Sequence, residues 1–134
     1  MTLKVNLFGG SHVEKSTLAA HAMAELRWEG VRCGVYGFTL DYDPEAVFVV
    51  VPPFTAIDEA RVRGMAEGAL NFLVLRRRDY PFSGARTREA WEALDAGIEE
   101  ALRRCEVRYK RLPGVRASVP YIMLKVRERL GVKR

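Results

Sequence analysis

The chain has 134 residues and a mass of 15.2 kDa, which suits a single domain, residues 1–134, with a hydrophobic core of its own. Its 49% hydrophobic and 29% charged content excludes a disordered or collagen-like protein. The sequence has no apolar run long enough to span a membrane and no signal-peptide layout, so we expect a cytoplasmic protein without a membrane partner. The net charge of +5 allows an anionic partner without requiring one.

The cysteine and arginine content adds two expectations. Cys33 and Cys105 lie far apart in the sequence without a Cys-x-x-Cys motif, so we expect buried free thiols. Most of the 22 basic residues are arginine and glutamine is absent, a bias that suits a GC-rich or thermophilic source.

Apolar runs and apolar repeats predict nine elements along the chain. In chain order they are a strand at residues 3–8, a helix at 15–29, strands at 31–38 and 46–51, a helix at 55–67, a strand at 69–75, a helix at 88–104, a strand at 107–112 and a last helix from about residue 118.

Local signals support several of these boundaries. Gly30 follows the first helix as a stop signal, and Thr55 is a candidate cap for the second. Residues 46–51 (AVFVVV) form a continuous apolar run, as in a central strand buried on both faces. Ser118 followed by Pro120 is typical of a helix cap with proline in the first turn.

The alternation of strands and helices predicts an α/β fold of three layers with a five-stranded, mainly parallel sheet. The connection between the second and third strands breaks the pattern. It has only about seven residues, 39–45, whereas a parallel crossover usually needs a dozen or more. We therefore expect the second strand to run antiparallel to the third, which would give a mixed sheet.

The segment after the first strand matches the phosphate-binding motif G-x-x-x-x-G-K-[ST] in all but one position. Glu14 stands where the second glycine belongs. In this motif backbone N–H groups and a helix N-terminus hold phosphate oxygens. The candidate phosphate-binding residues here are Gly9, Gly10, Lys15, Ser16 and Thr17.

Together with residues 70–77 (LNFLVLRR) and 80–86 (YPFSGAR), this segment resembles the small phage-encoded P-loop ATPases related to nucleotide kinases. The resemblance implies a P-loop fold, and ATP with Mg²⁺ as cofactors of a working member. It also implies that the segment containing Arg86 closes over the nucleotide. Arg86 would then face the γ-phosphate, with Arg76 or Arg77 helping to hold it.

Three departures from that family concern the chemistry. The Glu14 side chain crowds the loop and repels phosphate. The third strand ends in residues 50–53 (VVPP) without the acidic residue that holds Mg²⁺, and the nearest carboxylates in the sequence are Asp58 and Glu59. Residues 39–45 are too few to form the usual phosphate-acceptor site. We therefore predict a non-catalytic binding module, such as a phage factor that engages a host protein or a nucleic acid.

Two alternatives remain open. In one, the chain is an NTPase or phosphotransferase that uses Lys15, Ser16 and Arg86 to handle ATP. In the other, an arginine-rich rim binds nucleic acid or another anionic partner. Its core would be Arg76, Arg77, Arg78 and Arg88, joined by Arg61, Arg63 and Arg86.

No residue is predicted to be catalytic, and no metal site is expected. His12 and His21 have no second ligand at a metal-binding spacing.

Overall fold

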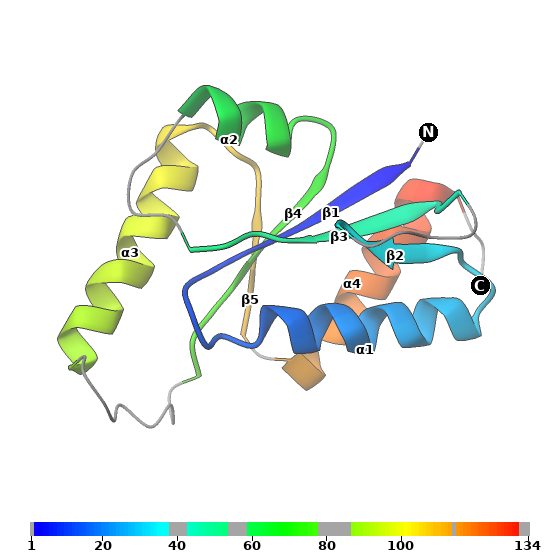
Figure 1. Cartoon of the computed structure of the whole chain (residues 1–134), viewed down its shortest axis with the longest axis horizontal. Coiled ribbons are helices and arrows are strands. Elements are labelled where there is room, and N and C mark those ends of the chain that lie inside the picture. The colour runs from blue at the N-terminus through cyan, green and yellow to red at the C-terminus, as the bar shows by residue number, and fades with distance from the viewer. Residues whose placement is uncertain (1, 38–42, 54–58, 78–86, 114, 132–134) are drawn as a thin grey trace.

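The computed structural model describes residues 2–37, 43–53, 59–77, 87–113 and 115–131. Strands and helices alternate along these residues, except that no helix is described between β2 and β3 (Figure 1). The elements are β1 (Leu3–Phe8), α1 (Lys15–Trp28), β2 (Cys33–Val35), β3 (Ala46–Val50), α2 (Glu59–Ala66), β4 (Leu70–Val74), α3 (Arg88–Arg104), β5 (Lys110–Leu112) and α4 (Val115–Leu130).

The strands form one parallel sheet in the order β2-β3-β1-β4-β5, with β1 at the centre. Helices α1 and α4 cover one face, and α2 and α3 cover the other (Figure 1). Each face has its own apolar core: Val5 and Leu7 of β1 belong to the first, and Phe8 to the second. The predicted α/β fold of three layers is confirmed.

The antiparallel orientation predicted for the second strand is wrong. β2 pairs with β3 in parallel, with Cys33 opposite Ala46 and Val35 opposite Phe48. β2 ends at Val35 rather than at residue 38, so the connection to β3 covers residues 36–45. An extended segment of that length can span roughly 33 Å, whereas the return along a three-residue strand needs only about 10 Å. A helix is therefore unnecessary for this crossover.

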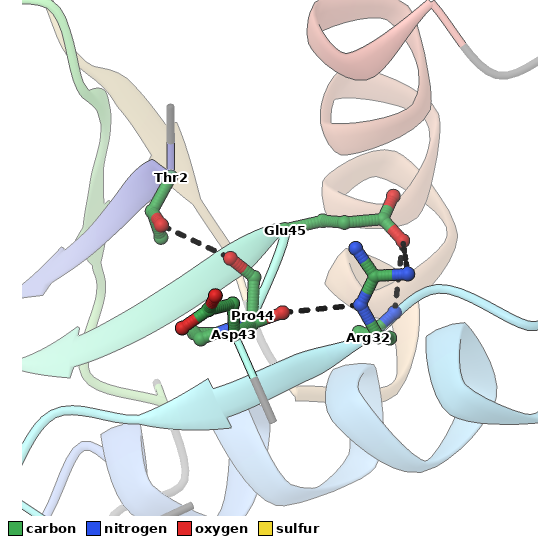
Figure 2. Close-up of polar contacts among 5 residues, drawn as sticks. All are labelled: Thr2, Arg32, Asp43, Pro44 and Glu45. Carbon is green, nitrogen blue, oxygen red and sulfur yellow. Dashed lines mark hydrogen bonds and ion pairs between the residues drawn. The ribbon is translucent and has the colours of Figure 1, made fainter.

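Arg32 fastens the end of that return connection to the start of β2 (Figure 2). Its Nε donates to the Asp43 carbonyl at 3.0 Å, and its guanidinium lies 3.5 Å from the Glu45 carboxylate. The Glu45 backbone N–H donates to the Arg32 carbonyl at 2.7 Å, next to the first pair of the β2–β3 ladder. From the other side, the Thr2 hydroxyl donates to the Pro44 carbonyl at 3.0 Å. These contacts hold the incoming chain in the parallel direction.

Most other predicted boundaries lie close to the observed ones. β1 and the long helix α3 have the predicted ends, and α1 ends one residue early, just before Gly30 with its left-handed φ of 87°. β5 is shorter than predicted, and the candidate cap Thr55 lies outside the described residues. Cys33 and Cys105 are buried free thiols, as expected.

The start of α4 was misplaced by the sequence signals. The helix begins at Val115, so Ser118 is a buried residue inside it rather than a cap, and Pro120 lies within the helix. The extra turn places Ser118 in the interior and Val119 against the apolar core. Packing of Val119 on the core outweighs the backbone hydrogen bond that Pro120 cannot make and the burial of the Ser118 hydroxyl, which has no hydrogen-bond partner among the described residues. None of the helices in the described part of the chain is long and apolar enough to cross a membrane.

Candidate functional site

The candidate site is the loop of residues 9–16, which leaves the central strand β1 and enters α1. The connection after β1 leads to the face covered by α1, whereas the connections after β3 and β4 lead to α2 and α3 on the opposite face. In open parallel sheets, ligands bind at the carboxyl ends of the strands where neighbouring connections diverge in this way. The loop occupies that position.

Glu14 adopts the backbone conformation that a glycine would favour. Its φ of 67° and ψ of 37° are left-handed, which costs a non-glycine residue about 1 kcal/mol. Its side chain is exposed, so the carboxylate lies on the solvent side of the loop. The Leu18 N–H donates to the Glu14 carbonyl at 2.9 Å, and no side chain caps the N-terminus of α1. Glu14 therefore leaves the N-terminus of α1 without a side-chain cap.

Lys15 carries a buried positive charge inside the loop. The residue is 8% exposed, and its Nζ donates to the Gly9 carbonyl at 2.6 Å. Burial lowers the pKa of this ammonium to about 8, and the positive charge of Arg76 acts in the same direction, while the Asp95 carboxylate opposes both. With this pKa, most Lys15 side chains are protonated at pH 7.

A pocket of about 570 Å³ opens between the loop and the end of β3. Residues 10–16 form one side, and residues 50–53 form the other. Lys15 and the uncapped start of α1 supply positive potential to this pocket, a combination that favours anions. Ser16 also lines it, and its side chain is exposed.

The part of the pocket lining that the structure describes does not fit a bound Mg²⁺ ion. Glu14 supplies the one carboxylate among the described residues that line it, and the β3 side consists of valine and proline. Glu59 is engaged elsewhere, because its carboxylate lies 3.1 Å from Nε of Arg104. Asp58 lies outside the described residues. Mg²⁺ prefers several oxygen ligands in octahedral geometry, which this lining does not provide.

Arg76 and Asp95 form a partly buried ion pair beside the loop, which the sequence did not reveal. Two guanidinium nitrogens of Arg76 donate to the two Asp95 oxygens at 2.8 and 2.9 Å. The Arg76 side chain is 6% exposed, and its Cζ lies 4.4 Å from the centre of the Trp91 ring. His12 of the loop meets the same ring edge-to-face at 5.9 Å. The Arg76 side chain is therefore held against α3 and is not exposed to solvent at the end of β4.

Gly10 allows this ion pair to approach the loop. A Cβ atom on Gly10 would lie 2.5 Å from Oδ1 of Asp95 and 2.9 Å from a terminal nitrogen of Arg76. One signal could have identified Asp95: it lies four residues after Trp91, on the same face of α3, between the apolar positions of that helix. A charge at such a position needs a partner, and Arg76 supplies it.

Of the other arginines predicted to bind anions, those that the structure describes do not all lie together. Arg77 and Arg88 are exposed next to the carboxyl ends of the strands, while Arg78 and Arg86 lie outside the described residues. Arg63 lies at the opposite edge of the sheet, where its Nε donates to the Cys105 carbonyl at 3.3 Å. Of the predicted phosphate-binding residues, Gly9, Gly10, Lys15, Ser16 and Thr17 lie together at the loop.

The described residues contain no cluster of three or more side chains suited to hold a metal ion. Searches with models of known protein families and among curated proteins find no match to this chain. The resemblance to phage P-loop ATPases and the thermophilic source therefore stay predictions from the sequence.

Proposed function

We propose that this protein is a non-catalytic binding module that holds a phosphate-bearing ligand, such as a nucleotide, in the loop of residues 9–16. The observation that carries the proposal is the buried Lys15 ammonium, which has a backbone carbonyl as its partner and faces a pocket at the start of α1. A carbonyl does not neutralise the charge. An anion that replaced it would therefore relieve an unfavourable state of the native protein.

Simple electrostatics favours phosphate binding despite Glu14. A phosphate about 4 Å from Lys15 gains about 4 kcal/mol at an effective dielectric constant of about 20. The exposed Glu14 carboxylate acts partly through water, where the same charge separation costs only about 1 kcal/mol. The attraction of Lys15 therefore exceeds the repulsion of Glu14.

The absence of catalysis is the second half of the proposal. Metal-assisted phosphoryl transfer requires a held metal ion and a positioned acceptor in addition to the phosphate cradle. Residues 50–53 offer no metal ligand, and the β2–β3 connection is limited to residues 36–45. We therefore expect ligand binding without turnover.

Binding of ATP can be measured by thermal unfolding and calorimetry, with and without Mg²⁺. At a ligand concentration of about 100 times Kd, the native state should gain about 2.7 kcal/mol, and the gain should not require Mg²⁺. Lys15→Met should abolish the effect, whereas Lys4→Met, which removes an exposed lysine from β1, should preserve it. Glu14→Gly should tighten binding.

Phosphate binding and the absence of catalysis can each be contradicted by a separate result. If neither ATP nor inorganic tripolyphosphate shifts the unfolding temperature, the loop is not a phosphate site. If ATP is hydrolysed at a rate that depends on Mg²⁺ and on Lys15, the module is an enzyme and the alternative from the sequence holds.

A further inference from the structure

A second candidate site lies at the amino-terminal edge of the sheet, at the opposite end of the strands from the loop of residues 9–16. It is a groove of about 770 Å³ where the chain enters β4 and β5, lined by residues 66–72 and 105–110 and by parts of α2 and α4. Its lining extends from the end of α2, on one face of the sheet, to α4 on the other. We call it the edge groove.

Basic side chains dominate the edge groove. The lining includes five basic residues and two acidic ones, so its net charge is +3. The basic residues are Arg63, Arg108, Lys110, Lys125 and Arg129, and the acidic residues are Glu67 and Glu106.

Three of these cations are not neutralised by a carboxylate. A terminal nitrogen of Arg129 donates to the Gly68 carbonyl at 2.7 Å, and the Lys110 ammonium lies 5.6 Å from the centre of the Tyr121 ring. Neither makes an ion pair with a described residue, and neither does the exposed Arg108. A carbonyl or an aromatic ring holds a cation in place but leaves its charge available. The edge groove therefore presents positioned positive charges.

Contacts among buried residues fix the floor of the edge groove. Asn71, at the start of β4, is 8% exposed and donates to the Ala66 carbonyl at 3.1 Å. Its side-chain oxygen accepts a 2.9 Å hydrogen bond from Asn6 of the central strand. Phe72 meets the Tyr121 ring edge-to-face at 6.2 Å. A ligand would thus meet a surface that needs little ordering on binding.

We propose that the edge groove binds the sugar–phosphate backbone of a single-stranded nucleic acid. Positioned cations that lack carboxylate partners match a chain of phosphates. Tyr121 lines the groove among these cations, and a base that displaces the Lys110 or Lys125 ammonium from its ring can stack there. An acidic peptide matches the charge of the groove but carries no flat base to place against a tyrosine ring. This nucleic-acid surface lies at the opposite edge of the sheet from the arginine rim predicted from the sequence.

Fluorescence anisotropy with labelled oligothymidylate and oligouridylate of about twelve nucleotides tests the proposal. With about three phosphates neutralised, affinity should fall about 20-fold between about 50 and 200 mM salt. Lys110→Gln or Arg108→Gln should weaken binding and reduce that loss to about 7-fold. Lys4→Gln removes the same charge outside the edge groove, so the affinity and its dependence on salt should both stay unchanged. Tighter binding of oligothymidylate indicates that the ligand is DNA, and tighter binding of oligouridylate indicates that it is RNA.

Several results would overturn the proposal. These are an absence of binding at about 50 mM salt, equal weakening by Lys4→Gln, or equally tight binding of an oligoglutamate of the same charge. The last result would assign the groove to an acidic protein segment. Lys15→Met should leave oligonucleotide binding intact, so this test is independent of the proposed phosphate loop. Circular dichroism of each variant checks that it is folded.

Discussion

The buried ammonium of Lys15 should make the native protein less stable at neutral pH than it would be with an uncharged side chain. The pKa of this group falls from its ordinary value of 10.5 to about 8 in the folded chain. A difference of about 2.5 between the two pKa values corresponds to about 3 kcal/mol at pH 7. Lys15→Met, which keeps an unbranched apolar side chain only one atom shorter and removes the charge, eliminates this cost.

The sign of the effect follows from proton binding. The unfolded chain holds the Lys15 proton more tightly, so between about pH 8 and 10.5 it binds more protons than the native protein does. The free energy of unfolding of the wild type should therefore rise with pH relative to that of the methionine variant. The cost of about 3 kcal/mol at pH 7 should fall to about 1.5 kcal/mol near pH 9.5. The methionine variant also loses the hydrogen bond to the Gly9 carbonyl, which lowers its free energy of unfolding by about 1 kcal/mol at both pH values.

Urea unfolding of both proteins at pH 7 and near pH 9.5 measures this directly. The variant should be more stable at pH 7, and its advantage should shrink by about 1.5 to 2 kcal/mol at the higher pH. Lys4→Met, which removes an exposed ammonium, corrects for the change in net charge. A stability difference that is the same at both pH values would refute the reasoning, because the native Lys15 would then hold its proton as tightly as the unfolded chain does.

Four further substitutions test the backbone geometry by urea unfolding. Glu106→Gly should stabilise the protein by about 1 kcal/mol, because Glu106 ends α3 with a left-handed φ of 58°; no gain would contradict that conformation. Gly10→Ala should destabilise it by about 2 kcal/mol, because the new Cβ would meet Asp95 at 2.5 Å, whereas Gly64→Ala in α2 has open space and should stabilise it by about 0.5 to 1 kcal/mol. Thr87→Ala should cost about 1 kcal/mol, because the Thr87 hydroxyl accepts a 3.2 Å hydrogen bond from the Ala90 N–H at the start of α3; an unchanged midpoint would exclude this cap.

The sequence alone determined the elements whose signals are local. Both ends of β1 and α3 follow from apolar periodicity and from turn residues within a few positions. The position of the loop of residues 9–16, between a strand and a helix, follows for the same reason. Side chains close in sequence decide these features, so their pattern is visible without knowledge of distant partners.

Tertiary structure alone decided the direction of β2, the start of α4 and the partner of Arg76. Ladder pairing with β3 and the contacts of Arg32 with the chain around Glu45 set the direction of β2. Packing of α4 on the sheet overrode the helix-start signal near Ser118. Asp95 meets Arg76 from another element, nineteen residues further along the chain. The energies of such contacts depend on residues that are distant in sequence and become neighbours only in the folded protein, so local patterns cannot reveal them.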